Sequence, residues 1–222
     1  MNVKSNEITY KQELARKSIH LVSLLIPILY VFVSRETAIY ILTPLTIAAI
    51  ILDFLSRKKT PVQKYIFALF GKILRSHETQ DKIVLNGASW VLISALLCVI
   101  VFPKIIFITA FSILITSDIA AALYGRKFGR HPLMGKSLEG FMAFIITAIM
   151  TVCFIGIMNS VPWTFYCFGI IASVVGAIAE LSSKKLKMDD NLTIPISVGI
   201  ILWIGNIPSE IWNAAYINLL QL

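Results

Sequence analysis

The sequence predicts an all-α polytopic membrane protein, with about seven transmembrane helices in a single integral membrane domain over residues 1–222. Of the 222 residues, 57% are hydrophobic and 14% are charged, whereas soluble domains carry about 25% charged residues. Seven apolar segments follow one another along the chain, and lysine and arginine are concentrated in alternate connectors. Because each span needs about 20 apolar residues, no room is left for a separate soluble domain.

We expect the seven segments to be helices, because an open strand cannot satisfy its backbone hydrogen bonds in lipid. The first segment follows polar residues and no small-residue cleavage site comes after it, so we expect no removable signal peptide. Several segments have nearer 15 than 20 residues, and short spans suit a protein that thins the bilayer. In chain order the segments cover residues 19–33, 38–55, 88–102, 105–123, 141–158, 163–181 and 192–207.

The basic residues predict the orientation in the membrane. Of the 20 lysines and arginines, 18 lie in the N-terminal segment and in the second, fourth and sixth connectors, which leaves Arg35 and Lys104 for the other side. The positive-inside rule then predicts a cytoplasmic N-terminus and a C-terminus outside. The same distribution explains the formal charge of +8, so we expect a lipid bilayer and no nucleic acid as partner. The pattern fits a bacterial inner membrane or an endoplasmic reticulum, and it predicts no particular oligomer.

The second connector predicts an amphipathic helix near residues 61–75. Thr60 can cap this helix and Pro61 suits its first position. We expect the helix to lie on the cytoplasmic membrane surface as an anchor, with guidance of a lipid substrate as the alternative role. Its apolar residues recur at helical spacing on one face: Val62, Tyr65, Ile66, Leu69, Phe70 and Ile73.

The unusual polar residues all fall on the expected cytoplasmic side, most densely in the stretch SDIAAALYGRKFGRHPLMGKSLEG over residues 117–140. Asp118 shares a helix face with Ala121, Ala122 and Gly125, and such small residues allow close helix packing. An ionisable group in a membrane segment usually marks a site, although an aspartate can also reach water from a helix end. The glycines and basic residues after it suit phosphate binding, and they could equally be a topology signal. These basic residues are Arg126, Lys127, Arg130 and Lys136.

Two further polar clusters face the same side. One is a stripe within helical reach at the start of the first span, where a solvated helix entrance is the alternative. The other precedes the seventh span, where carboxylates can cap a helix, bind a metal, or both. The first contains Glu13, Arg16, Lys17 and His20, and the second contains Glu180, Asp189, Asp190 and Asn191.

Carboxylates beside a basic, glycine-containing loop match what a nucleotide–Mg²⁺ complex requires. Magnesium takes hard oxygen ligands and keeps several waters, so a few carboxylates suffice. Phosphoryl transfer depends mainly on positioning and charge neutralisation, which lysine, arginine and the metal provide. These residues therefore indicate a nucleotide-dependent enzyme that modifies lipid. A small membrane transporter is the alternative from another class, but its polar residues should lie in mid-membrane, often within paired repeats.

The stretch at 117–140 is similar to the D-x-x-A-x-x-x-G-R-x-F-G…K-[ST]-x-E-G segment of membrane enzymes that use CTP. Two families share this segment, the CDP-diacylglycerol synthases and the polyprenol kinase family of dolichol, phytol and CTP-dependent diacylglycerol kinases. Three other stretches resemble motifs of the kinases, and the C-terminal His-Gly-Gly signature of the synthases is absent. The resemblance runs from about Glu13 to Gly199, and its other stretches are ELARKSIH, RSHETQDKIVLNGASW and ELSSKKLKMDDNLTIPISVG.

The resemblance implies a kinase that transfers the γ-phosphate of CTP to the hydroxyl of a membrane lipid alcohol at the cytoplasmic face. The alcohol would be a polyprenol or dolichol, a phytol-like isoprenoid, or diacylglycerol. A phosphatidate cytidylyltransferase of the CDP-diacylglycerol synthase type is the alternative enzyme, because it would use the same CTP loop.

The resemblance also implies roles for individual residues. Mg²⁺ would be held by Asp118 and Asp190, with Asp189 as a competing ligand and Glu180 beside them. The general base would be His77, Glu78 or one of the aspartates. The phosphates, the nucleotide and the lipid head would be contacted by Gly125, Arg126, Gly129, Gly135, Lys136, Ser137, Glu139, Gly140, Asn191, Arg16, Lys17 and His20.

Overall fold

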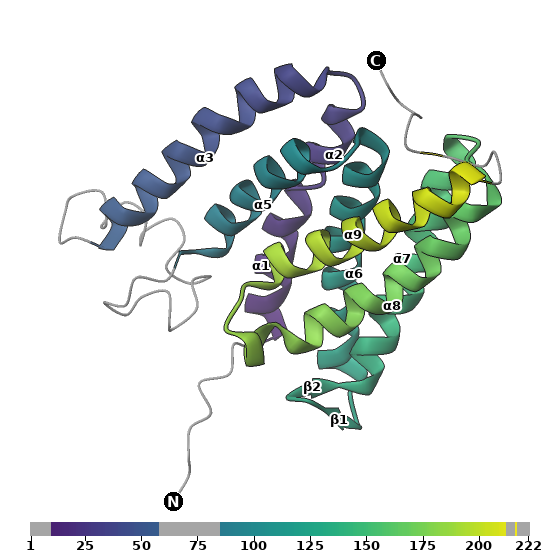
Figure 1. The fold of residues 1–222 in the computed structure, drawn as a ribbon. Helices are drawn as coiled ribbons and strands as arrows, with labels where there is room; N and C mark the ends of the chain where they lie inside the picture. Colours follow the sequence, from purple (N-terminus) through teal and green to yellow (C-terminus); the bar gives the residue numbers. More distant parts are fainter. Residues whose placement is uncertain (1–9, 58–84, 212–215, 217–222) are drawn as a thin grey trace, which may run out of the picture.

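The computed structural model describes residues 10–57, 85–211 and 216, and over these it is a helical bundle with one short β-hairpin (Figure 1). The prediction of an all-α architecture is therefore confirmed for the described residues, apart from two strands of two residues each. The elements in order are α1 (Tyr10–Val22), α2 (Leu25–Tyr30), α3 (Arg35–Arg57), α5 (Gly87–Val101), α6 (Lys104–Phe128), β1 (Pro132–Leu133), β2 (Lys136–Ser137), α7 (Leu138–Met158), α8 (Trp163–Leu186) and α9 (Asp190–Ile211).

Four helices among the described residues are long and apolar enough to cross a membrane. They lie within α3, α6, α7 and α8, which supports a membrane protein with several spans. Helix α5 is also apolar but has 15 residues, or about 22 Å at 1.5 Å per residue, against a hydrocarbon core of about 30 Å. Seven spans and the orientation of the termini remain predictions. The amphipathic helix expected near residues 61–75 lies outside the described residues.

The segment predicted as the first span, 19–33, is interrupted. Helix α1 ends at Val22 and α2 begins at Leu25. Pro27 has no N–H to donate to the carbonyl of Ser23, and Ile26 donates to that carbonyl instead at 3.0 Å. This tighter turn replaces the regular helical bond, which explains the interruption. The polar residues of the N-terminal stripe therefore all belong to α1, and α2 is apolar.

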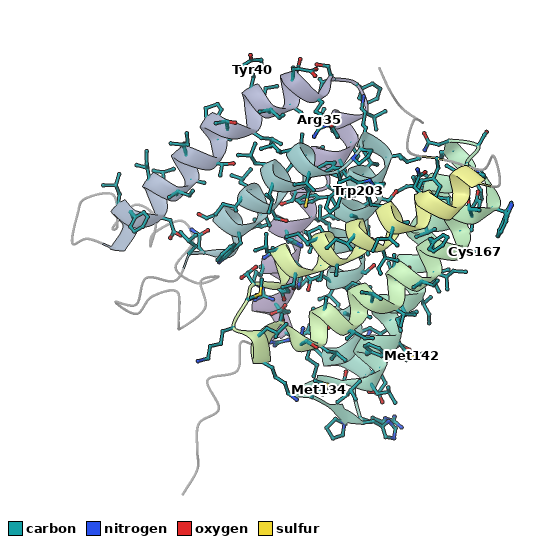
Figure 2. All side chains as sticks on the ribbon, viewed as in Figure 1. Arg35, Tyr40, Met134, Met142, Cys167 and Trp203 are labelled. Atoms are coloured by element: carbon teal, nitrogen blue, oxygen red, sulfur yellow. The ribbon has the colours of Figure 1, made fainter. Side chains whose placement is uncertain are left out.

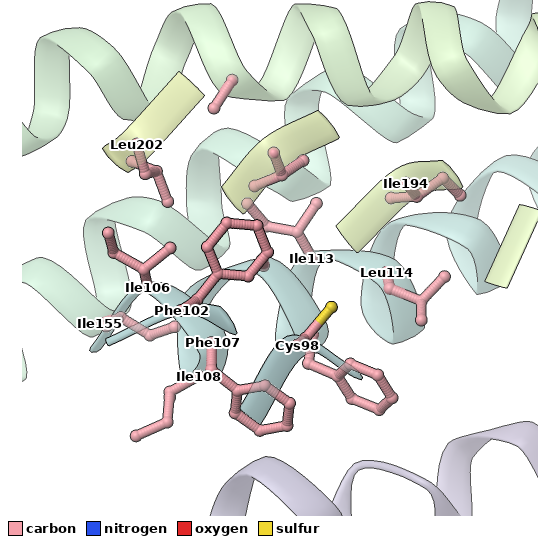
Figure 3. Packing of buried hydrophobic residues seen from close by; sticks show 14 of the residues in the cluster. Cys98, Phe102, Ile106, Phe107, Ile108, Ile113, Leu114, Ile155, Ile194 and Leu202 are labelled. Carbon is pink, nitrogen blue, oxygen red and sulfur yellow. The ribbon is translucent and has the colours of Figure 1, made fainter. Parts of the chain in front are cut away.

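Helix α6 is the central helix of the bundle. It packs against α1, α2, α5, α7, α8 and α9. Of the residues in its most apolar stretch, 78% are buried, compared with 22% for the peripheral helix α3. Its side chains Ile106, Phe107, Ile113 and Leu114 fill the core shown in Figure 3. The burial continues to Asp118, so this carboxylate lies in the protein interior, not at an exposed helix end.

Helix α3 packs mainly against α5 and lies at the edge of the bundle (Figure 1). Its large apolar side chains are exposed, and Figure 2 shows Tyr40 pointing away from the other helices. In water such a surface would be unfavourable, whereas lipid tails cover it without cost. The exposed face of α3 is therefore further support for a position in a membrane.

Candidate functional site

The predicted site residues that the structure describes meet at one end of the bundle, which is called here the site end. It is formed by α1, the C-terminal ends of α6 and α8, the β-hairpin, and the N-terminal ends of α7 and α9 (lower part of Figure 1). Four ionisable residues at this end are almost completely buried. Their exposed fractions are 2% for Glu13, 4% for Lys17, 7% for Asp118 and 5% for Glu180. Burial of charge is costly, so each of these groups needs a partner.

The partners of Asp118 come from α1. Lys17 donates its Nζ hydrogen to Oδ2 of Asp118, and both side chains are buried. Nε2 of His20 lies 3.5 Å from the same oxygen. Because Lys17 and His20 are three residues apart on a helix, they share one face and can reach one carboxylate. Packing of α1 on α6 therefore places two groups that can bear positive charge on the buried aspartate.

A second lysine–carboxylate pair joins the hairpin to α8. Nζ of Lys136, on β2, donates to Oε1 of Glu180 and to the backbone carbonyl of Glu180 at 3.0 Å. Lys136 also attracts Asp118 electrostatically, and Glu180 repels both Asp118 and Asp190. Five elements thus contribute to one set of interacting charges, called here the buried charge cluster: Lys17, His20, Asp118, Lys136, Glu180 and Asp190. Lys17, Asp118 and Glu180 are buried, and the other three are partly exposed.

A smaller ion-pair group lies beside this cluster. Arg16 contacts Oε1 of Glu13 at 2.5 Å, and Arg126 contacts Oε2 of Glu13 at 3.5 Å. Arg126 is therefore turned toward α1, as a residue of the last turn of α6. The two arginines exceed the charge of one carboxylate by one, so the group keeps a positive charge that can attract an anion.

The stretch at 117–140 is more ordered than the flexible glycine loop that we expected. Gly125 lies inside α6, and its carbonyl accepts from the amide of Gly129 at 2.9 Å. A Cβ on Gly125 would lie 3.2 Å from Cα of Gly140, and a Cβ on Gly140 would lie 2.8 Å from the carbonyl oxygen of Ala121. These glycines let α6 and α7 touch through their backbones. The expectation of a loop from Gly125 onward is wrong, because the helix continues to Phe128.

The hairpin and its base hold the other predicted loop residues. Ser137 caps α7 by accepting from the amide of Gly140 at 3.1 Å. Glu139 accepts from Nδ1 of His131 at 2.7 Å and so closes the base of the hairpin. Gly135 has φ +83°, and no atom lies within 4 Å of the position of a Cβ. The turn at Gly135 is therefore the open part of the stretch, where an anion could approach the backbone.

Substitution of Gly140 tests the close contact of α6 and α7. Gly140→Ala would place its methyl group against the backbone of Ala121 and Gly125, so the helices must move apart. We expect a loss of stability of about 1–3 kcal/mol, measured as a lower thermal unfolding temperature of the purified protein in detergent. Gly87→Ala is the matched control, because its methyl group would meet only Nδ2 of Asn191 at 3.9 Å. Equal unfolding temperatures for the two variants would contradict the close contact.

The two aspartates at the start of α9 have different partners. Asp189 caps the helix, since its Oδ1 accepts from the backbone amide of Asn191 at 3.0 Å and from Nδ2 of Asn191 at 2.7 Å. Asp190 is the first residue of α9, and it interacts electrostatically with His20 and Glu180. Asp190 is therefore part of the buried charge cluster, whereas the carboxylate of Asp189 holds the helix start together with Asn191.

Comparison with known proteins assigns the chain to a family. It is 33% identical over 196 residues to a protein of Rickettsia prowazekii (strain Madrid E) described as "Uncharacterized protein RP860", and the match covers 88% of this chain and 94% of the relative. The chain belongs to the RP860 family. It is also 26% identical over 196 residues to "Uncharacterized protein MJ1137" of Methanocaldococcus jannaschii, covering 86% of this chain and 93% of that relative. No family model and no solved structure matches.

The described carboxylates of this RP860-family chain do not form a metal site of protein ligands alone. Within residues 10–57 and 85–211, no three or more His, Cys, Asp or Glu side chains form a group that could hold a metal ion. Asp118 and Glu180 each accept from a lysine instead. A protein usually supplies Mg²⁺ with one or two carboxylates, and substrate phosphates and water provide the other oxygens.

One buried acidic residue of the RP860-family chain, Asp53, was not among the predicted site residues. Asp53 on α3 is 4% exposed, and its Oδ2 accepts from the amide of Asn86 at 2.8 Å. Asn86 in turn caps α5. The signal was a single carboxylate within an apolar run. The candidate bases His77 and Glu78 lie outside the described residues.

Proposed function

We propose that this protein is a membrane lipid kinase that transfers the γ-phosphate of CTP to the hydroxyl group of a lipid alcohol. The observation that supports this proposal is the buried charge cluster, in which α1, α6, β2, α8 and α9 bring lysines and carboxylates together at one end of the bundle. Ionisable groups buried at such a position are costly and usually serve a function. The choice of CTP rests on the resemblance of the sequence motifs.

In this proposal the two lysines exchange partners when the nucleotide binds. Lys17 and Lys136 now pair with Asp118 and Glu180. A triphosphate is a stronger anion, and the lysines would turn to its oxygens and release the carboxylates. Arg126 shares the carboxylate of Glu13 with Arg16, and its remaining positive charge would neutralise a further phosphate oxygen. The open turn at Gly135 would allow the backbone to approach the phosphates.

Mg²⁺ would be held by Asp118 and Asp190 together with phosphate oxygens, and it would neutralise charge on the transferred group. Asp189 is the weaker candidate ligand because its carboxylate caps α9. Glu180 would keep the released Lys136 within reach of the phosphates. Ser137, Glu139 and Asn191 would hold the hairpin and the start of α9 in place.

The chemical step forms a bond between the lipid hydroxyl oxygen and the γ-phosphorus and breaks the bond from that phosphorus to the β-phosphate oxygen. CDP leaves, and the hydroxyl proton passes to a base, for which an aspartate of the cluster, His77 and Glu78 are candidates. His20, 3.5 Å from the Asp118 carboxylate, would contact the lipid head or a phosphate. The acceptor would be a polyprenol or dolichol, a phytol-like isoprenoid, or diacylglycerol.

The reaction would take place at the cytoplasmic face of a bacterial inner membrane or an endoplasmic reticulum. The support is that the described basic residues of three lysine- and arginine-rich segments lie at the site end: Arg16, Lys17, Arg126, Lys127, Arg130, Lys136, Lys185 and Lys187. The positive-inside rule assigns such segments to the cytoplasm.

Comparison of two labelled nucleotides tests the proposed donor. The purified protein would receive Mg²⁺, a pool of diacylglycerol, polyprenols and phytol, and either CTP or ATP labelled at the γ-phosphate. We expect label in a lipid product with CTP, and chromatography of that product identifies the acceptor. Label from ATP alone would contradict the choice of donor, and no label from either nucleotide would contradict the kinase.

The interruption between α1 and α2 favours a transporter as the second candidate, because discontinuous helices often line transport sites. A transporter would bind its cargo without transferring label from any nucleotide. The phosphatidate cytidylyltransferase remains the alternative enzyme, since the same cluster could bind CTP for attack at its α-phosphate.

A further inference from the structure

The hairpin between α6 and α7 lies where a bilayer surface is expected. It joins two candidate spans, one of which ends at Phe128 while the other begins at Leu138. The nine residues between these spans leave no length for the hairpin to move far from the membrane. We therefore expect the hairpin near the interface between the hydrocarbon core and water. Figure 1 shows it at the site end, beside the ends of α6 and α7.

The hairpin and the adjoining helix ends expose large apolar side chains. Met134 is 47% exposed at the tip of the hairpin, and Figure 2 shows it at the end of the molecule beside β1 and β2. The last turns of α6 also expose two aromatic side chains, Tyr124 and Phe128, whose rings lie 4.6 Å apart. The exposed apolar side chains are Tyr124, Phe128, Met134, Leu138 and Met142.

The basic side chains of this region divide into two groups. Arg126 and Lys136 pair with the buried carboxylates of Glu13 and Glu180, although Arg126 itself stays exposed. Lys127 and Arg130 are exposed, and no ion pair joins either of them to another described residue. Nζ of Lys127 lies 5.2 Å from the centre of the Phe128 ring. The outer surface of the hairpin thus combines apolar side chains with positive charge.

The backbone at the tip indicates that the apolar side chain of Met134 has a use. Met134 has φ +47° and is followed by Gly135 with φ +83°. Both central residues of this tight turn are left-handed, a geometry that favours asparagine or glycine over methionine at the first position. An exposed apolar side chain is unfavourable in water, and cover by lipid would remove that cost although it leaves the backbone conformation unchanged.

We propose that this hairpin docks on anionic phospholipid in the bilayer that holds the protein. Met134 and Phe128 enter the boundary between headgroups and acyl chains, where amphipathic and aromatic side chains concentrate. Lys127 and Arg130 bind the negatively charged headgroups. The inference goes beyond the proposed function and does not depend on it, because it concerns the outer surface of the hairpin and requires no nucleotide.

Spin labelling tests the docking. Met134→Cys would be made in a background with Cys153→Ser and Cys167→Ser, since Cys98 is buried in the core. The nitroxide-labelled protein would be placed in phosphatidylcholine vesicles with or without phosphatidylglycerol. Accessibility to oxygen and to a polar nickel complex gives the depth of the label. Met150→Cys, on an exposed face in the middle of α7, marks the hydrocarbon core, and a free nitroxide marks water.

We expect the label at position 134 to have an oxygen-to-nickel accessibility ratio between those of the two references. When phosphatidylglycerol is omitted, this ratio should fall several-fold, toward the value of the free nitroxide in water. Adding Lys127→Gln and Arg130→Gln should remove this dependence on anionic lipid while the Met150→Cys value stays unchanged. A ratio equal to that of the free nitroxide in both lipids would overturn the proposal. Exclusion of both reagents would also overturn it, because the tip would then be covered by protein.

Discussion

Asp118→Asn is expected to lower transfer of phosphate to lipid by about a hundredfold or more. The substitution keeps the size of the side chain but removes the charge that pairs with Lys17 and that would hold Mg²⁺. The rate of label transfer from γ-labelled CTP measures this loss. Removal of one partner also leaves a buried charge without compensation, which costs about 3–5 kcal/mol, so stability must be measured beside activity.

A double substitution separates the catalytic role of Asp118 from its role in packing. Lys17→Met alone leaves Asp118 without its closest partner, with His20 still 3.5 Å away. Lys17→Met with Asp118→Asn removes both charges of the pair. We expect the double variant to regain most of the thermal stability and to remain inactive. Recovery of transfer in the double variant would show that the pair is only structural, which contradicts the proposed site.

Lys136→Ala is expected to cause a loss of similar size, about a hundredfold in kcat/KM for CTP. Lys136, on β2, reaches α8, where it contacts both the side chain and the backbone of Glu180. Its ammonium group would neutralise a phosphate of the nucleotide in the proposed reaction. Initial rates at several CTP concentrations give the separate effects on kcat and KM.

Two controls support the interpretation of the Lys136 variant. Lys185→Ala removes an exposed charge near the end of the same helix as Glu180 and should leave the rates unchanged. Glu180→Gln should weaken the hold on Lys136 and lower the rate less than loss of the lysine itself. A lower unfolding temperature of Lys136→Ala with an unchanged transfer rate would show that Lys136 only holds the hairpin against α8, which would contradict its proposed role in the reaction.

The helical fold and the meeting of the polar residues at one end were accessible from the sequence because they depend on local patterns. Apolar runs predicted the positions of α3, α5, α6, α7, α8 and α9, although their ends differ by several residues. The spacing of Ala121 and Gly125 predicted close approach of another helix, and Gly140 of α7 is the residue that makes this contact. The grouping of polar residues on one side predicted where the site end lies.

The partners within the site were not predictable, because they depend on packing between distant segments. Lys17 and Asp118 are separated by 101 positions, and Lys136 and Glu180 by 44. No local pattern states which lysine meets which carboxylate. The interruption at Ser23 depends on Pro27, four residues later, which has no N–H to donate. The capping role of Asp189 depends on where α9 starts.

The most direct test of the central claim compares CTP labelled at the γ-phosphate with CTP labelled at the α-phosphate. Each would be incubated with the purified protein, Mg²⁺ and a lipid pool that includes diacylglycerol, polyprenols, phytol and phosphatidate. The proposed kinase predicts labelled lipid from the γ-position alone, and no such label with Asp118→Asn. Label from the α-position alone would establish a cytidylyltransferase, and absence of label from both positions would leave the buried charge cluster to a transporter. Either of these results would contradict the kinase.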